Sequence, residues 1–376
     1  MKAVSGAVGG LTATVGALMA LAISVSAVAA DISVQTYPPQ PLIERTRYGQ
    51  ALNFDLEVTN GRQDALELTG IRLRVVDRRG AVAQRLEIND NGIAPGLQTV
   101  PVRSWTSGQS HTIFNPFHTL AGDLDIGRLE YELVFRATGD QTVTTALTVT
   151  PATYRQKARL RLPLPGRVLV WDGHDFYSHH RRWDFSHPVV KQMGITTNAA
   201  RYSFDLVVVD DRARFFKGDG SRREDYASFG HTVIAPGDGS VVAAYGDAAN
   251  EPAPLTRTMY REEPLRAIYG NYVVIDHGHG EYSQLGHLKQ GSVRVRVGQR
   301  VRQGQPVAEA GASGTSLFPH LHYQLVSAPG DDGEGLPVYF DEYRRVVGAV
   351  EVRESGVAID SGDILVSAAP ISLEAD

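Results

Sequence analysis

Two histidines one residue apart are the most chemically informative feature of this 376-residue sequence. His320 and His322 lie in the segment 316–325, whose pattern indicates a β-strand. Successive side chains of a strand point to opposite faces, so both imidazoles should lie on the same face. Imidazole acts at neutral pH both as a metal ligand and as an acid or base. The spacing therefore predicts a site in which one histidine binds a metal and its neighbour takes part in proton transfer.

The composition limits which other groups could complete such a site. The sequence contains no cysteine, so a metal would have to be held by His, Asp or Glu, and disulfides are excluded. Its 37 Lys and Arg residues against 42 Asp and Glu residues give a net charge of −5. This balance gives no indication of a nucleic-acid partner.

The first thirty residues have the layout of a secretory signal peptide. Lys2 precedes an apolar run from about Leu11 to Val25, and small residues fill positions 26–30. The run is short for a membrane-spanning helix, although an uncleaved anchor remains an alternative. We expect export to the periplasm or cell envelope, a mature chain that begins near Asp31, and no membrane span after cleavage.

Residues 31–150 are predicted to form an immunoglobulin-like β-sandwich. Apolar and polar residues alternate at Leu52–Val58 and at Leu129–Phe135, and Asn60-Gly61 is typical of a turn. No sustained helical period interrupts this pattern, which favours two antiparallel sheets. Residues 151–166 mix prolines with basic residues and are interpreted as a linker.

Residues 167–348 are predicted to carry the function. Ten of the twelve histidines follow Arg167, and short valine-rich segments are separated by glycine-rich turns. The expected strands are Tyr202–Asp210, Thr232–Ala235, Ser240–Ala244, Tyr272–Asp276, Glu281–His287, Val293–Val297 and His320–Val326. The whole chain is therefore expected to be all-β. The pattern assigns no role to the tail at residues 349–376.

Three blocks in this region resemble, in order and approximate spacing, the lysostaphin-type (LytM-type) zinc endopeptidases that cut peptidoglycan cross-links. The blocks are Val233–Val242, Gly270–Leu288 and Val293–Tyr323. The resemblance covers residues 230–325. It implies a β-sandwich hybrid fold (duplicated hybrid motif), one Zn²⁺ per chain, and hydrolysis of amide bonds in peptidoglycan peptides.

The resemblance also implies roles for four residues. In that family the second histidine of the His-x-His pair binds zinc, and the first acts on the substrate or the attacking water. By resemblance His322 is a metal ligand, and His320 and His287 are the catalytic histidines. Asp205, in the segment 201–207, matches the family's carboxylate ligand. Zinc held in this way keeps an open position for water and polarises a carbonyl.

The first ligand departs from the family pattern. The usual form is His-x-x-x-Asp, but Arg201 stands four residues before Asp205, and a guanidinium does not deprotonate to bind a cation. The chain resembles a subgroup in which the histidine comes from an earlier His-Arg-Arg segment. This resemblance transfers the ligand to His180, with His179 as the alternative. A solvated basic loop at His180 and a salt-bridged Asp205 are the structural alternatives.

Other interpretations remain open at this point. A catalytically inactive module that keeps the fold and binds or regulates cell-wall hydrolysis is the main alternative, and Arg201 is its main support. The Gly-Gln turns at Gly298 and Gly304 also resemble biotinyl and lipoyl carrier domains, but no lysine stands at a hairpin tip. His277 and His279 are interpreted as turn residues. The N-terminal sandwich is expected to contact the wall or a cell-envelope protein partner, or to cover the cleft.

Overall fold

The protein is nearly all β, as the sequence predicts. The computed structural model describes residues 31–330 and 332–367. The predicted signal peptide at residues 1–30 and the last nine residues of the tail lie outside this range. Within it, no helix is long and apolar enough to cross a bilayer.

The N-terminal strands form three sheets. The orders are β1-β4-β8, β11-β10-β5-β6 with β7 beside β5, and β12-β2-β3-β9. Their bounds are β1 Ile32–Tyr37, β2 Leu42–Arg45, β3 Gln50–Leu52, β4 Asp55–Asn60, β5 Leu66–Val76, β6 Val82–Asn89, β7 Ser104–Trp105, β8 Ser110–Phe114, β9 Thr119–Leu120, β10 Arg128–Ala137, β11 Thr142–Val149 and β12 Ala152–Thr153. Short 3₁₀ turns span Gly96–Thr99 and Thr138–Asp140.

One apolar core holds the first two of these sheets together. In β10 the side chains of Leu129, Tyr131, Leu133 and Phe135 are buried, and the residues between them are more exposed. They contact buried residues of β4, β5 and β8 in a single cluster. The alternation therefore arises because each strand presents one face to a shared core.

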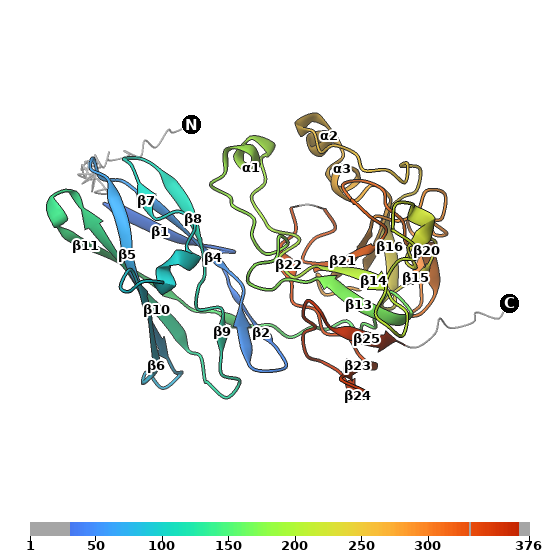
Figure 1. Ribbon diagram of the computed structural model, residues 1–376, viewed down its shortest axis with the longest axis horizontal. Coiled ribbons are helices and arrows are strands. Elements are labelled where there is room, and N and C mark those ends of the chain that lie inside the picture. The colour runs from blue at the N-terminus through green and yellow to red at the C-terminus, as the bar shows by residue number, and fades with distance from the viewer. Residues whose placement is uncertain (1–30, 331, 368–376) are drawn as a thin grey trace, which may run out of the picture. The chain divides into compact units, whose positions relative to one another are not determined.

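A large sheet of 11 strands dominates the rest of the described chain (Figure 1). Its order is β19-β16-β17-β18-β21-β14-β13-β25-β23-β24, with β22 beside β21, and β15 pairs with β20 separately. The bounds are β13 Gly166–Asp172, β14 Phe204–Val208, β15 Thr232–Ile234, β16 Gly239–Tyr245, β17 Tyr272–Asp276, β18 Tyr282–Gly286, β19 Arg300–Val301, β20 Pro306–Glu309, β21 Leu321–Val326, β22 Gly335–Leu336, β23 Tyr343–Val347, β24 Val350–Glu354 and β25 Ile364–Ser367.

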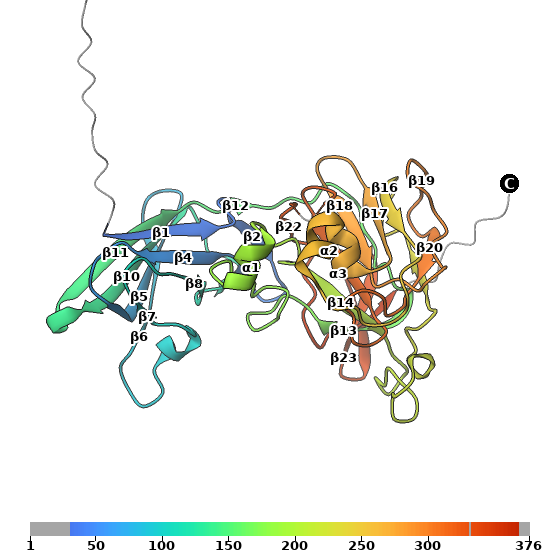
Figure 2. The ribbon, with the colours of Figure 1, turned by 90° about the horizontal axis from the view of Figure 1, so that it is seen from above.

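Three short helices and one 3₁₀ turn accompany this sheet. They are α1 Pro188–Met193, α2 Arg257–Glu262, α3 Pro264–Tyr269 and the turn Arg223–Asp225. Figure 2 shows α2 and α3 side by side near β17 and β18. Pro264 at the first turn of α3 suits a position whose N–H would have no helical partner.

Two regions differ from the sequence-based expectations or extend them. Val293–Val297 is not a strand: Arg294 donates to the Val307 carbonyl, but the described residues form no ladder of bonds along the segment. The tail contributes β24 and β25, and β25 pairs with β13 along Gly166–Leu169. Residues 350–367 are therefore part of the sheet.

β21 lies near the middle of the sheet and is buried along its whole length. Its neighbours are β14 and β18. Its residues Leu321, Tyr323 and Leu325 belong to the apolar core, which also contains Leu206 and Phe340. A strand fixed in this way holds its side chains in a constant direction, as a site built on it requires.

A buried polar cluster joins β4 to the segment before β14. Arg201 donates to Asp55 at 2.8 Å and to Glu334 at 2.5 Å, and the side chains of Arg201 and Asp55 are both fully buried. Asn53 donates to the Arg201 carbonyl at 2.9 Å and accepts from Arg181 Nε at 2.5 Å. Arg201, at the position where the family pattern has a ligand, is thus held in an ion pair.

The buried pair of His174 and Glu44 predicts a pH-dependent stability. Their side chains are 3.0 Å apart. Burial lowers the pKa of His174, but the Glu44 carboxylate raises it by a larger amount, so the net shift of the pKa is upward. The stabilisation is then complete below the unfolded pKa of about 6.5 and disappears as the pH rises through the raised folded-state pKa.

We expect His174→Gln to lower the free energy of unfolding by roughly 1–3 kcal/mol at about pH 6 and by less at about pH 9. Urea unfolding of both proteins at the two pH values measures this difference. An equal loss at both values would contradict the assignment of a protonated His174.

Candidate metal centre

Strand pairing brings the predicted site residues into one row across the sheet. In the register of β14 and β21, Asp205 lies directly opposite His322, and on the other side of β21 His322 is paired with Gly286. His287 is the next residue after Gly286. Directly opposed residues of antiparallel strands share a face, so positions more than a hundred residues apart meet at one point.

Asp205 is the centre of this group. Its Oδ1 lies 2.9 Å from His322 Nδ1, 3.3 Å from His320 Nε2 and 3.5 Å from His180 Nε2. His320 and His322 thus face the same carboxylate oxygen, as their spacing predicts. The carboxylate is buried, so the three imidazoles replace the water it would otherwise contact.

His180 comes from the loop that follows β13. Ser178 donates to the Gly173 carbonyl at 2.6 Å and accepts from the His180 N–H at 3.1 Å. The His180 ring donates from Nδ1 to the same Gly173 carbonyl at 2.8 Å. Because a carbonyl only accepts, Nδ1 carries a proton, and Nε2 is the ring nitrogen turned toward Asp205.

The other three imidazoles are fixed in the same manner. His287 Nδ1 donates to the Ser313 carbonyl at 2.8 Å, and His320 Nδ1 donates to the Phe318 carbonyl at 2.8 Å. His322 is reversed, since its Nε2 donates to Gln324 Oε1 at 2.9 Å and its Nδ1 is hydrogen-bonded to Asp205 Oδ1 at 2.9 Å. Each ring therefore commits at least one nitrogen to a protein oxygen. Protein partners of this kind orient the histidines of metal sites.

This donor set fits a metal ion. His180 Nε2, Asp205 Oδ1 and His322 Nδ1 are two imidazole nitrogens and a carboxylate oxygen, the ligand types that zinc takes from proteins without cysteine. His320 Nε2 is buried and makes no hydrogen bond among the described residues, although Asp205 Oδ1 lies 3.3 Å away. An uncommitted buried ring nitrogen costs free energy unless a ligand or substrate uses it.

His179, the alternative first ligand, lies on the outer side of the same group. Its side chain is 69% exposed, whereas that of His180 is 3% exposed. His179 Nδ1 lies 2.5 Å from Asp172 Oδ2. Asp172, His179, His180 and Asp205 nevertheless offer donor atoms within 4.8 Å of one another.

Burial and charge set the protonation states of the group. Burial raises the pKa of Asp205, but His320 and His180 outweigh it and hold that pKa well below its usual range. Burial, with His320 and His322 nearby, holds the pKa of His287 well below its ordinary value. Burial likewise lowers the pKa of His322. An ionised carboxylate and a neutral imidazole are the forms that bind metals.

The backbone beside the centre is tightly constrained. A Cβ on Gly286 would lie 2.9 Å from the ring of Tyr269, so glycine allows this ring to lie 5.1 Å from that of His322. His287 has a φ of 57°, which is uncommon for a residue other than glycine. Such strain is concentrated at functional sites.

A cavity of about 520 Å³ opens over these side chains. Trp171, Leu317 and Phe318 line it together with the site histidines, and Leu317 is 84% exposed. The ring of Trp171 lies 5.4 Å from that of Phe318. Apolar walls around a few convergent polar groups are typical of a ligand site.

Two neighbouring residues were not identified from the sequence. Gln324 lies two residues after His322, so the same strand period would have placed it on the face of the site. Asp172 faces Asp205 in the pairing of β13 with β14, and nothing in the local sequence indicates this.

His277 and His279 lie outside the centre, as expected for turn residues. His277 is held by the Asp238 carbonyl at 2.7 Å and by Ser283 Oγ at 2.8 Å. His279 has a φ of 61° in the turn between β17 and β18. Neither residue lines the cavity.

The fold and the site define a β-sheet protein with a buried cluster of His and Asp side chains suited to a metal ion. The model of Peptidase family M23 matches residues 223–333. These residues therefore form an M23 (LytM-type) peptidase domain. The match includes His287, His320 and His322, but Asp205 and His180 precede it.

Relatives of this domain are named for cell-wall hydrolysis. The chain is 35% identical over 97 residues to peptidoglycan DD-endopeptidase ShyA of Vibrio cholerae serotype O1, which is 26% of this chain and 18% of that protein. It is 32% identical over 103 residues to ShyB of the same organism, covering 27% and 19%. It is also 42% identical over 57 residues to murein hydrolase activator EnvC of Escherichia coli K12, covering 15% and 13%. The matched segments thus span less than a fifth of each relative.

Proposed function

We propose that the chain is an exported zinc metalloendopeptidase that hydrolyses amide bonds in peptidoglycan peptide cross-links. The observation that carries this proposal is the arrangement of His180, His320 and His322 around Asp205, with His287 beside them. The M23 domain supports a hydrolase, and the names of the relatives support peptidoglycan as the substrate.

His180 Nε2, Asp205 and His322 Nδ1 would hold the zinc. They are the ionised carboxylate and the two ring nitrogens that face it, since the Gly173 and Gln324 bonds occupy the other nitrogen of each ring. His180 is preferred to His179 because His179 is mostly exposed and already bonded to Asp172. When bound, zinc lowers the pKa of water toward about 7 and polarises the scissile carbonyl.

His287 and His320 are proposed as the catalytic histidines. Their rings are 4.8 Å apart, and both line the cavity. Since both Nδ1 atoms donate to backbone carbonyls, Nε2 of each ring is the atom available to accept or donate a proton. Such positioned groups take the proton of an attacking water, stabilise the oxyanion, or protonate the leaving amine.

Replacement of His320 by alanine tests whether the chain is an enzyme. We expect cleavage of purified cross-linked muropeptide dimers to fall by about 10²–10⁴-fold, while zinc content and binding of the dimer are retained. Mass spectrometry of the products and zinc analysis measure both. His277→Ala, in the turn outside the cavity, is the matched control. A dimer that stays intact with the wild-type protein would contradict the proposal.

Export belongs to the same proposal, with residues 1–30 as the signal peptide. Peptidoglycan lies outside the cytoplasm, so the proposed substrate requires it. The amino-terminal residue of the protein recovered from the cell envelope tests this, and we expect it near Asp31.

A second candidate function is a peptidase-fold module that regulates cell-wall hydrolysis. Two observations favour it: one relative is named a murein hydrolase activator, and Arg201 stands where the family pattern has a histidine ligand. A module of this kind would bind the muropeptide dimer without cutting it and would be indifferent to His320→Ala. Its partner would be a cell-envelope protein, with the N-terminal strands as a candidate contact surface.

A further inference from the structure

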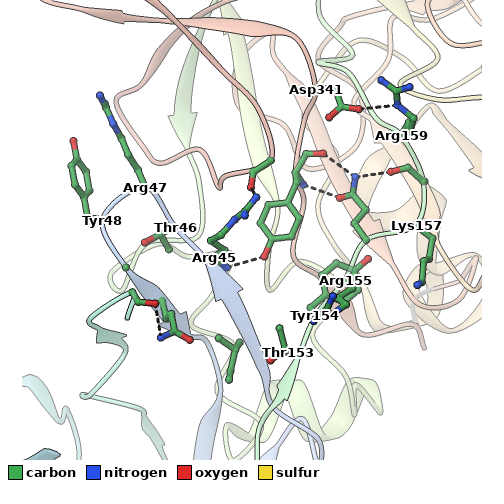
Figure 3. Close-up of a pocket in the computed structure, with 18 residues that line it drawn as sticks. Arg45, Thr46, Arg47, Tyr48, Thr153, Tyr154, Arg155, Lys157, Arg159 and Asp341 are labelled. Carbon is green, nitrogen blue, oxygen red and sulfur yellow. Dashed lines mark hydrogen bonds and ion pairs between the residues drawn. The ribbon is translucent and has the colours of Figure 1, made fainter. Parts of the chain in front are cut away.

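A second cavity, of about 960 Å³, has five basic side chains in its lining. We name it the basic cleft and define it by five cationic residues and three tyrosines. They are Arg45, Arg47, Arg155, Lys157, Arg159, Tyr48, Tyr154 and Tyr339. Asp341 is the one acidic residue in its lining, and the cleft shares no lining residue with the cavity over the metal centre. Figure 3 shows these side chains.

Most of this positive charge is not neutralised by the protein. Arg47 is 3.3 Å from Glu354, and Arg159 is 3.3 Å from Asp341. Across residues 31–330 and 332–367, Arg45, Arg155 and Lys157 have no carboxylate within ion-pair distance; Arg45 donates instead to the Gly356 carbonyl. Uncompensated cations in a concave surface attract anionic ligands.

Three of the basic residues alternate along one segment of the chain. Positions 155, 157 and 159 are exposed and alternate with half-buried residues, and the chain bends at Ala158. Several cations distributed along one cleft suit a polymer that carries repeated negative charges, rather than a single small anion.

The segment is held rigidly from behind. The buried Glu281 carboxylate accepts from the Tyr154 hydroxyl at 2.9 Å and from the N–H groups of Lys157 and Ala158 at 2.8 Å and 2.6 Å. Gln156 and Tyr339 exchange two further bonds of 2.8 Å. A cleft preorganised in this way spends little entropy on ordering when a ligand binds.

Aromatic faces add a second type of contact. Tyr48 is 80% exposed, and the Arg47 guanidinium lies 5.4 Å from its ring. The ring of Tyr339 lies beneath Arg45 at 6.0 Å. Tyrosine rings present an apolar body with a polar tip, and guanidinium groups form paired hydrogen bonds with carboxylates.

We propose that the basic cleft binds a linear, carboxylate-bearing glycopeptide strand, at a site separate from the metal centre. The identity of the strand as peptidoglycan, and with it the carboxylate, rests on the proposed function; the preference for a polymer of negative charge rests on the cleft. The cleft would hold the substrate polymer while a cross-link occupies the other cavity.

Binding of solubilised, uncut peptidoglycan strands to the mature chain tests this, with a chelator present so that hydrolysis plays no part. We expect Arg155→Glu combined with Lys157→Glu to weaken binding about tenfold, since each exposed ion pair contributes a factor of roughly two to five. Added salt should weaken wild-type binding as well. Arg296→Glu with Arg300→Glu, two exposed arginines outside both cavities, is the control of equal charge change and should bind like the wild type.

Two other probes show whether binding depends on the carboxylates of the strand, on negative charge of any kind, or on the sugar. Inorganic polyphosphate carries phosphate charges, and a neutral chitin oligosaccharide carries none. Stronger binding of polyphosphate than of the peptidoglycan strands, or equal binding of the neutral sugar, would overturn the proposal. Unchanged binding by the variant with both cleft substitutions would also overturn it. The chelator prevents hydrolysis, so this experiment measures binding alone. A protein without peptidase activity could still bind the strands through the cleft, and an active peptidase could lack this binding.

Discussion

Replacing Asp55 with alanine is expected to lower the free energy of unfolding by about 3–5 kcal/mol. Asp55 and Arg201 are both fully buried and 2.8 Å apart, and removing Asp55 leaves the buried Arg201 charge with Glu334 as its remaining ion-pair partner among the described residues. Burial lowers the pKa of Arg201, but Glu334 and Asp55 outweigh it, so the guanidinium stays charged. It cannot escape the loss by becoming neutral. Urea unfolding followed by circular dichroism measures the change.

The matched control is Glu132→Ala. Glu132 pairs with Arg72 at the same type of distance, 2.9 Å, but both side chains are about half exposed. Exposed pairs contribute about 0–1 kcal/mol, so this variant should unfold close to the wild type. Similar losses in the two variants would show that burial is not what makes the Asp55 pair important.

The second large effect is expected at the metal centre. His322→Ala should abolish stoichiometric zinc binding, because it removes the ring whose Nδ1 lies 2.9 Å from Asp205. Hydrolysis should fall with the metal, since water activation and carbonyl polarisation depend on it. Zinc content after dialysis, measured by plasma mass spectrometry, is the direct readout.

Gln324→Leu provides a graded comparison for that result. Gln324 accepts from His322 Nε2 at 2.9 Å and so directs Nδ1 toward Asp205. Loss of such a supporting bond costs about 10–100-fold in metal affinity, less than loss of the ligand itself. If His322→Ala retained one zinc per chain, the proposed ligand set would be wrong.

The arginine at position 201 connects these two expectations. Asn53 accepts from Arg181 and donates to the Arg201 carbonyl, and Arg181 directly follows His180. Asn198 also donates to the His180 carbonyl at 2.9 Å. The loop carrying the proposed first ligand is therefore anchored by β4 and its neighbours. Arg201 therefore has a structural role in holding this loop, at the position where the family pattern has a histidine.

Much of the fold could be predicted because it depends on local patterns. The alternation in β10 and the valine-rich β17 gave their positions directly, and the His-x-His spacing placed His320 and His322 on one face. Asp205 came from the resemblance to a family rather than from its own neighbours. In the segment Val293–Val297, apolar and polar residues alternate as in a strand. Among the described residues, its one backbone bond to a neighbouring strand joins Arg294 to Val307, and a strand requires a continuous ladder of such bonds.

The rest of the site depends on long-range register, which a single sequence does not contain. Asp172 meets Asp205 only because β13 pairs with β14 at those residues. Asp55 meets Arg201 across 146 positions of the chain. The choice between His179 and His180 depends on which ring the Gly173 carbonyl holds. Each of these is decided by packing of distant segments.

The most direct test of the account is mass spectrometry of purified sacculi incubated with the mature protein, with and without a zinc chelator. We expect release of cleaved cross-link peptides that stops with the chelator and returns when zinc is restored. Intact cross-links in the presence of folded, zinc-supplied protein would contradict it and would favour a regulatory module.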